Sequence, residues 1–196
     1  MSKQSYHKSP QKLLKETPFL LAPMDEVTDI GFRTLCEEMG SAYATTELTS
    51  VDALVRERVF ESRYKREQLK TNSIQLFGHS PQTFVDAAKK VNEEADFFDI
   101  NFGCPSACVN KNDSGAFLLK DPKNVGKIIS TLTSNTNLPI TAKIRLGYKN
   151  TSFLDIAKEI EDAGAQLITV HGRTASQKYS GKTNWDAIKE IYEKSN

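Results

Sequence analysis

The chain has 196 residues and a formal net charge of +1, with 26 Lys and Arg against 25 Asp and Glu. This length suffices for one domain with a sizeable core, and the ordinary apolar and charged fractions exclude wholesale disorder. No apolar run approaches the roughly 20 residues that a membrane span needs, and residues 1–17 lack the apolar centre of a secretory signal, so we expect a cytoplasmic protein.

Residues 1–17 are predicted to form an N-terminal tail with a turn of helix. After them, short apolar strands alternate with amphipathic helices. The strands are apolar with little polar alternation, as expected of parallel strands that are covered on both faces. They are predicted to begin near Pro18, Ala42, Ser73, Phe97, Pro139 and Gln166.

The helices between these strands carry start and stop signals. A capping side chain followed by proline begins two helices, at Ser80-Pro81 and at Asp121-Pro122. Ser152 caps a third helix, which Gly164 ends, and Asn184 caps the last one.

Two helices have apolar stripes that we expect to be buried. The helix that begins near Asp29 and ends at Gly40 is predicted to bury Phe32, Leu35, Cys36 and Met39. In the last helix the residues predicted to face inward are Trp185, Ile188 and Ile191.

Six βα units in series predict a parallel sheet or barrel. The chain contains neither G-x-G-x-x-G nor a Walker loop, so neither a Rossmann dinucleotide site nor a P-loop is supported. Residues of varied chemistry follow several strands, which is how barrel active sites are built. We therefore predict an α/β fold of the TIM (β/α)8 type, truncated to its first six βα units.

The residues at the strand ends define the candidate site. A single polar residue in an apolar strand, such as Gln75 or Lys143, is more often a satisfied core group. Polar residues on several strands that converge at one edge favour a ligand site instead. The candidates are Pro23, Met24, Asp25, Gln75, Asn101, Cys104, Lys143, Arg145, His171 and Arg173.

Cys104 is a candidate nucleophile or general acid. A thiol with an ordinary pKa of about 8.5 is mostly protonated near neutrality and can donate a proton. The nucleophile role needs a nearby base, for which His171 is the candidate. The commoner role of cysteine, a small buried hydrophobe, fits Cys36 and Cys108 better, because Gly and Pro hold Cys104 in a turn.

The three cysteines are too few for a disulfide scaffold, and Cys104 and Cys108 lack C-x-x-C spacing. A site made of Cys104, Cys108 and His171 lacks a fourth ligand, so we expect no metal. No acidic residue lies between residues 122 and 154 or between 163 and 185, although Lys and Arg occur in both stretches. These stretches suit a polyanion, but charge bias alone more often marks a solvated face.

From about Phe19 to Ile191 the chain closely resembles the tRNA-dihydrouridine synthases. The resemblance rests on six motifs in the family's order and spacing: APMDEVTDIGFRTLC, QLFG, DINFGCP, DSGAFLLKDP, AKIRLG and VHGRTASQKYSGKTNWDAI. Each motif alone is of modest specificity, and the six together are very specific. The resemblance implies a TIM-barrel flavin enzyme that reduces a uridine of tRNA to 5,6-dihydrouridine, with FMN as hydride carrier and NADPH as reductant.

The resemblance also implies residue roles. Cys104 is implied to donate a proton to C5 of uracil after hydride from the reduced flavin has reached C6. The residues implied to bind FMN are Pro23, Met24, Asp25, Gln75, Lys143 and His171. The residues implied to bind the substrate, with Asn101 holding the flipped-out uracil, are Asn101, Arg145 and Arg173.

The chain departs from the family pattern chiefly in length. A TIM barrel has eight strands, and the two further units normally carry loops that grip a cofactor phosphate. We therefore expect residues 18–196 to form an incomplete flavin-binding catalytic domain without the family's helical tRNA-binding domain. Such a truncated form is expected to bind FMN weakly, and inactivity of the chain by itself is one outcome that the sequence leaves open. Asp25-Glu26 also replace a small residue and glycine of many relatives, which leaves open how Asp25 contacts the flavin.

Three alternatives remain open at this point. One is a flavin oxidoreductase of the dihydroorotate dehydrogenase or enoate type on the same barrel. Another is a truncated, non-catalytic barrel that acts as an RNA-binding or structural module. The third is a Schiff-base aldolase that uses Lys143.

Overall fold

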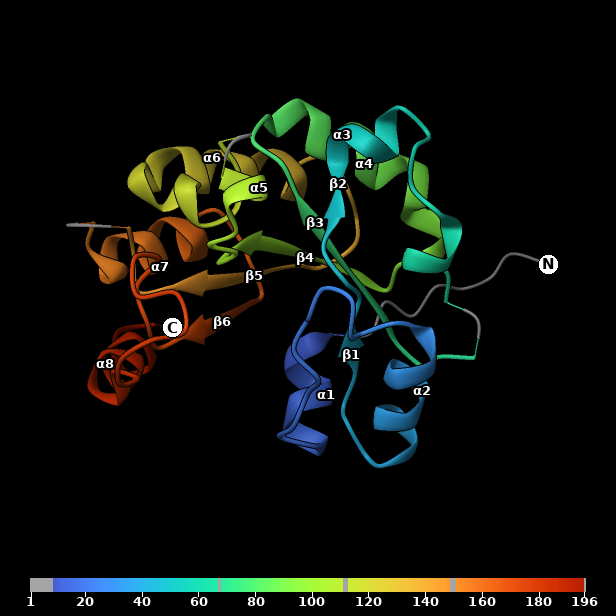
Figure 1. The fold of residues 1–196 in the computed structure, drawn as a ribbon, viewed down its shortest axis with the longest axis horizontal. Helices are drawn as coiled ribbons and strands as arrows, with labels where there is room; N and C mark the ends of the chain where they lie inside the picture. The colour runs from blue at the N-terminus through green and yellow to red at the C-terminus, as the bar shows by residue number, and fades with distance from the viewer. Residues whose placement is uncertain (1–8, 67, 111–112, 149–150, 196) are drawn as a thin grey trace.

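The computed structural model describes residues 9–66, 68–110, 113–148 and 151–195. At its centre is a parallel sheet in the order β1-β3-β4-β5-β6, with β2 also paired to β3 (Figure 1). The strands are β1 (Ala44–Thr45), β2 (Thr49–Ser50), β3 (Asn72–Phe77), β4 (Phe97–Phe102), β5 (Ile140–Arg145) and β6 (Leu167–His171). The first predicted strand contributes a parallel bridge between Leu21 and Ala44. Because the strand order follows the chain, the sheet is an open part of a (β/α)8 barrel, as predicted.

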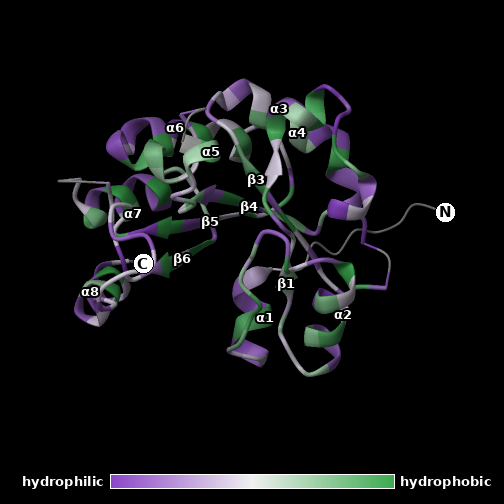
Figure 2. Cartoon of the chain, in the orientation of Figure 1, coloured by the Kyte–Doolittle hydropathy of each residue, from purple (hydrophilic) through white to green (hydrophobic). Residues whose placement is uncertain are grey.

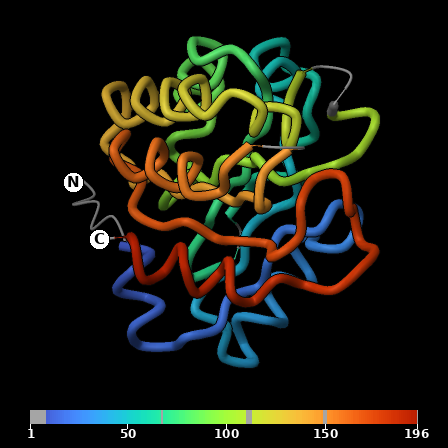
Figure 3. Tube along the Cα trace, turned by 90° about the vertical axis from the view of Figure 1, so that its left-hand side faces the viewer, coloured from blue at the N-terminus to red at the C-terminus, as the bar shows by residue number. Residues whose placement is uncertain are grey.

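Helices cover the outer face of this sheet. Figure 3 shows α6, α7 and α8 in succession along one side. The longer helices are α1 (Pro10–Glu16), α2 (Ile30–Glu38), α4 (Pro81–Val91), α6 (Pro122–Thr133), α7 (Phe153–Asp162) and α8 (Trp185–Lys194). The shorter helical segments are α3 (Val51–Val55), η1 (Glu61–Arg63), η2 (Asn92–Glu94), α5 (Ala107–Asn110) and η3 (Gly115–Lys120).

The predicted helix caps are confirmed. The side chains of Ser80, Asp121, Ser152 and Asn184 each accept a hydrogen bond from a backbone N–H in the first turn of their helix. Such a bond satisfies one of the N–H groups that a helix leaves unpaired at its start. Local sequence signals therefore fix where these helices begin.

The hydrophobic core lies between the sheet and the helices. Ile74 of β3, Ile100 of β4 and Ile144 of β5 are fully buried against residues of α4 and α6 such as Phe84 and Ile128. In Figure 2 the outward faces of these helices are hydrophilic. The described helices therefore cover the outer face of the sheet and do not cover its inner face.

The predicted burial of α2 is wrong. Leu35 and Met39 are exposed, Met39 at 81%, whereas Arg33 and Glu37 are buried. Arg33 Nη1 donates a 2.9 Å hydrogen bond to Asn72 Oδ1, and Glu37 accepts hydrogen bonds from backbone N–H groups before β3. These buried partners turn the polar side of α2 toward the sheet and its apolar side outward.

The prediction for α8 holds only in part. Ile191 is buried, whereas Trp185 is 73% exposed. Both α2 and α8 belong to units at the ends of the open sheet, where a further βα unit would lie beside them in a closed barrel. These exposed apolar side chains of α2 and α8 therefore lie at the two ends of the sheet.

Helix α1 lies within the predicted N-terminal tail. Gln11 Nε2 of this helix donates a hydrogen bond to the carbonyl of Gln166, directly before β6. Leu21, a few residues after α1, lies at the opposite edge of the sheet beside β1. The segment before the first strand therefore reaches from one edge of the open sheet to the other. Within the described parts of the chain, no helix is long and apolar enough to cross a membrane.

Candidate functional site

The strands have an apolar outer face and a polar inner face, so the prediction of strands with little alternation is wrong. Every second residue of β3, β4 and β5 belongs to the hydrophobic core. The residues between them are mostly polar, and pairing places them side by side on the inner face. These polar residues are Thr45, Ser73, Gln75, Asp99, Asn101, Thr141, Lys143, Arg145, Thr169 and His171.

Three neighbouring strands contribute one row of hydrogen-bonded side chains. Gln75, Asp99 and Thr141 are directly paired across β3, β4 and β5. The two Asp99 carboxylate oxygens accept hydrogen bonds of 2.7 Å, one from Gln75 Nε2 and one from Thr141 Oγ1. The sequence prediction found Gln75 but missed Asp99 and Thr141, which the alternation of polar residues along the strands would have indicated.

Asn101 connects this row to the loop after β4. Its Nδ2 donates to Gln75 Oε1 at 2.8 Å, and its Oδ1 accepts from the backbone N–H groups of Gly103 and Cys104 at 3.0 and 2.9 Å. The Asn101 side chain is therefore part of the turn that carries Cys104.

Cys104 is half-buried at the mouth of the sheet. Burial raises the pKa of its thiol and Asp25 raises it further, while Arg145 and Lys143 act in the opposite direction. The thiol is therefore protonated near neutral pH, as a proton donor requires. Gly115 packs over this turn, where a Cβ atom would lie 2.8 Å from the Cys104 carbonyl oxygen.

Lys143 extends from β5 next to Asn101. Burial lowers the pKa of its ammonium group, Asp99 and Cys104 raise it, and Arg145 lowers it. Among the described residues the ammonium group forms neither a hydrogen bond nor an ion pair. A partly buried amine in this situation is suited to an anionic or electron-rich ligand.

Arg145, two residues further along β5, is buried and holds two loops. Its Nε donates to the Gly103 carbonyl at 2.7 Å, and its Nη1 donates to the carbonyls of Thr174 and Lys178 at 3.2 and 2.6 Å. The guanidinium group also lies 5.4 Å from the Tyr179 ring centroid. We predicted a substrate or phosphate contact for Arg145, and its hydrogen bonds to these loops indicate a structural role as well.

His171 pairs with Arg145 across β5 and β6, and Arg173 follows in the next loop. Burial and the charges of Arg145, Lys143 and Arg173 lower the pKa of His171 to about 4. Arg173 Nη1 lies 3.2 Å from His171 Nε2, so Nε2 is the acceptor and the proton of the neutral ring is on Nδ1. His171 is therefore uncharged near pH 7.

The candidates Pro23, Met24 and Asp25 lie in the loop that follows Leu21, the residue of the first predicted strand that bridges to β1. Thr28 Oγ1 closes this loop through hydrogen bonds with the Met24 backbone at 3.1 and 3.0 Å. Asp25 lies near enough to Cys104 to raise the pKa of the thiol, and it pairs with Arg63 at 3.4 Å. The structure thus brings Asp25 into the same electrostatic environment as the candidates on the strands, and Arg63 is a partner that the sequence prediction missed.

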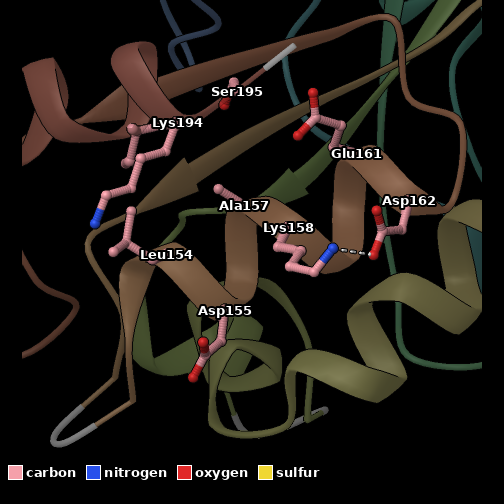
Figure 4. A pocket seen from close by; sticks show the side chains of 9 residues that line it. Leu154, Asp155, Ala157, Lys158, Glu161, Asp162, Lys194 and Ser195 are labelled. Atoms are coloured by element: carbon pink, nitrogen blue, oxygen red, sulfur yellow. Dashed lines mark hydrogen bonds and ion pairs between the residues drawn. The ribbon is translucent and has the colours of Figure 1, made fainter.

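A separate groove of about 200 Å³ lies between α7 and α8 (Figure 4). Both lysines that line it are already paired, since Lys158 bonds Asp162 and Lys194 bonds Glu190. The groove lies on the outer, helical side, whereas the candidate residues share the inner face of the sheet. Among the described residues no group of three or more His, Cys, Asp or Glu is placed to hold a metal ion.

The fold and the site together define a protein of the (β/α)8-barrel class, with polar and ionisable groups gathered at the carboxyl ends of its strands. In this class the carboxyl ends of the strands carry the chemistry.

A family model described as "Dihydrouridine synthase (Dus)" matches residues 20–196. A probable tRNA-dihydrouridine synthase of Rhizobium leguminosarum bv. phaseoli is 37% identical over 178 residues, which cover 89% of this chain and 56% of the relative. The tRNA-dihydrouridine synthase B of Vibrio cholerae serotype O1 is 36% identical over 177 residues, which cover 88% and 55%. The chain belongs to the dihydrouridine synthase family.

The chain spans about half the length of these curated relatives. Among solved structures, the carboxyl transferase domain of Rhizobium etli pyruvate carboxylase gives a TM-score of 0.47 at 10% identity, over 96% of this chain and 34% of that one. A likeness at this level says nothing about function.

Proposed function

We propose that this chain forms the flavin-binding part of an FMN-dependent enzyme that reduces a uridine of tRNA to 5,6-dihydrouridine. The observation that carries the proposal is the inner face of the sheet and its mouth, where the protonated thiol of Cys104, the Asn101 amide and the Lys143 ammonium lie in one region. Among the described residues this ammonium group has no hydrogen-bond or ion-pair partner. Membership of the dihydrouridine synthase family supports the substrate class. NADPH is the proposed source of reducing equivalents.

The donor set on this face fits a flavin. The ring system of FMN presents an electron-rich edge that gains negative charge on reduction, and Lys143 offers an ammonium group that forms no hydrogen bond with the residues that the structure describes. In the proposed arrangement Lys143, Gln75 and His171 hold the polar edge, and Pro23, Met24 and Asp25 flank the ring. When bound, FMN supplies the hydride that reaches C6 of uracil.

The protein groups supply the proton and the orientation of the base. Cys104 gives its S–H proton to C5 of uracil, and burial keeps that proton on the thiol until the base is in place. Gln75 uses one N–H of Asn101 Nδ2, which leaves the second for a uracil carbonyl. Arg145 holds the loops on either side of this position.

A base in folded tRNA must leave its stack to reach such a face. Lys178 and Lys182 lie exposed in the acid-free loop after β6, beside the mouth of the sheet. We propose that this loop contacts the tRNA phosphates near the reduced base, as Arg173 does from within the site. This tRNA contact is electrostatic, so it is expected to weaken as salt rises.

The lowered pKa of Lys143 also fits the Schiff-base aldolase alternative. Treatment with a carbonyl substrate and borohydride distinguishes the two functions. In an aldolase, Lys143 would form a Schiff base with the substrate, and borohydride would reduce it to a stable covalent adduct. We expect no adduct.

The direct test is single-turnover formation of dihydrouridine by the purified chain with FMN, NADPH and tRNA that lacks the modification. Dihydrouridine is expected with the parent chain and with Cys36→Ala, and it is expected to be lost with Cys104→Ala. A chain that binds FMN but gives no dihydrouridine, or a Cys104→Ala variant as active as the parent, would contradict the proposal.

A further inference from the structure

A chain of hydrogen bonds joins the buried carboxylate of Asp99 to the turn that carries Cys104. Asp99 Oδ2 accepts from Gln75 Nε2 at 2.7 Å, and Gln75 Oε1 accepts from Asn101 Nδ2 at 2.8 Å. Asn101 Oδ1 then accepts from the Cys104 backbone N–H at 2.9 Å. We propose that Asp99 is a positioning residue, which orients both amide side chains and through them holds the Cys104 turn.

The direction of each hydrogen bond in this series follows from which atoms can donate and which can accept. A carboxylate oxygen accepts hydrogen bonds, so Gln75 presents its NH₂ group to Asp99. The Gln75 carbonyl then faces Asn101, which in turn presents its own NH₂ group. The Asn101 carbonyl oxygen is left for the backbone N–H groups of Gly103 and Cys104. If Gln75 were reversed, its NH₂ group would face the NH₂ group of Asn101. If Asn101 were reversed, its NH₂ group would face the backbone N–H groups of Gly103 and Cys104.

Burial makes this order strict. The exposed fractions of Gln75, Asp99 and Asn101 are 1%, 5% and 7%, so solvent cannot replace a missing partner. Thr141 Oγ1 donates to the second Asp99 oxygen. Burial raises the pKa of Asp99, while the hydrogen bonds from Thr141 and Gln75 and the charge of Lys143 act in the opposite direction and favour the carboxylate. Asp99 therefore has partners that hold its acceptor oxygen toward Gln75.

This inference gives a role to a residue that the proposed function does not use. It rests on the proposed function only for the catalytic importance of Cys104. What it says about the structure is that Asp99 keeps the Cys104 thiol partly buried. The reactivity of this thiol can be measured without flavin or tRNA. When the turn loosens, the thiol gains solvent and loses the burial that raises its pKa, so it reacts faster with an alkylating agent.

The test measures iodoacetamide alkylation of Cys104 from pH 7 to pH 9 in a Cys36→Ser, Cys108→Ser background. Asp99→Leu removes the acceptor and is expected to raise the rate at pH 7 by roughly threefold or more. Thr141→Val is the matched control, because it removes the other hydrogen bond of Asp99 and leaves the one to Gln75. Its rate is expected to stay within about twofold of the parent.

Asp99→Asn tests whether the hydrogen-bond order or the negative charge of Asp99 matters, because it removes the charge and can keep the order. Its oxygen can face Gln75 while its NH₂ group faces the Thr141 hydroxyl, so the order of donors and acceptors is kept. We expect the parent rate within about twofold. An acceleration equal to that of Asp99→Leu would show that charge, not hydrogen-bond order, matters, and would overturn the proposal.

If Asp99→Leu does not fold, Gln75→Met decides the question, because it breaks the same chain while Asp99 stays in place. Its rate is expected to rise like that of Asp99→Leu. Parent-like alkylation of a folded Asp99→Leu or Gln75→Met variant, or equal acceleration by Thr141→Val, would overturn the proposal. Absence of dihydrouridine formation with the predicted alkylation rates would count against the proposed function and leave this inference standing.

Discussion

Arg145 of β5 donates a 2.6 Å hydrogen bond to the carbonyl of Lys178, a residue with φ +51° in the loop after β6. The same guanidinium group donates to the Gly103 carbonyl in the turn that carries Cys104. One buried side chain therefore holds together the loops after two separate strands, on both sides of the candidate site. A positive φ at a non-glycine residue is unfavourable by itself, so such a loop conformation depends on contacts of this kind.

Arg145→Lys is expected to loosen both loops, because an ammonium group cannot reproduce the planar fork that reaches three carbonyls. The loss of these charge-assisted hydrogen bonds should lower the free energy of unfolding by about 2 to 4 kcal/mol. Trypsin cleavage after Lys178 or Lys182 in the native state should become faster. The exposed Arg58→Lys is the control, and equal cleavage of the two variants would contradict the role given to Arg145.

Asp25→Asn is expected to lower the pKa of Cys104, since the Asp25 charge is one of the causes that raise it. The pH dependence of iodoacetamide alkylation measures this pKa, and the profile should move to lower pH. Asp86→Asn, on the outer helix α4, is the control and should leave the profile in place. An unchanged profile in Asp25→Asn would place Asp25 too far from the thiol to act on it.

His171 should make stability depend on pH. Its folded-state pKa is about 4, below the usual value of about 6.5 in an unfolded chain, so the unfolded state takes up the proton first. The free energy of unfolding should therefore fall as the pH decreases from about 6.5 toward 4. Because His171 is partly exposed, solvent screening keeps this contribution to about 1 kcal/mol.

Urea unfolding at pH 7 and pH 4.5 measures this effect, with His171→Gln as the comparison. The variant should lose less stability than the parent between the two pH values. An identical loss would mean that His171 titrates in the same way in the folded and unfolded chains.

Asn72, at the amino end of β3, should matter for stability and not for the flavin. Its Nδ2 donates to the carbonyls of Tyr64 and Glu94, and its Oδ1 accepts from the buried Arg33. Asn72→Ala removes all three of these hydrogen bonds, which should lower the free energy of unfolding by about 2 to 4 kcal/mol. FMN affinity of the folded variant should stay unchanged, because the amino ends of barrel strands support the fold rather than the site. Weaker FMN binding by the folded variant would contradict a purely structural role for Asn72.

Local signals made much of the fold predictable. Apolar runs located β3 to β6, and side chains such as Ser80 and Asp121 marked helix starts, because a cap acts within its own first turn. The inward side of α2 was not predictable in this way. Arg33 is buried because it bonds Asn72, which lies 39 positions further along the chain. A partner so distant in sequence leaves no local pattern.

The candidate site was predicted as a set of strand-end residues, and its functional roles stay a prediction; the network that joins these residues was not predicted. Lys143 and Gln75 stood out as polar residues in apolar strands, and Cys104 as a thiol in a turn. The alternation of polar residues would have placed Asp99 on the inner face, but its hydrogen bonds to neighbours on β3 and β5 depend on the strand register, which the sequence pattern does not give. The resemblance to a family suggested roles for single residues, whereas the structure shows how Asn101 joins two of them.

The central claim is that the inner face of the sheet binds FMN through Lys143. Titration of FMN with the purified chain, followed by flavin fluorescence, tests it most directly. We expect saturable binding that weakens about tenfold or more in Lys143→Met, a loss of about 1.4 kcal/mol, and that is unchanged in the control Lys158→Met on α7. Absence of saturable binding, or equal affinity of the two lysine variants, would contradict the account.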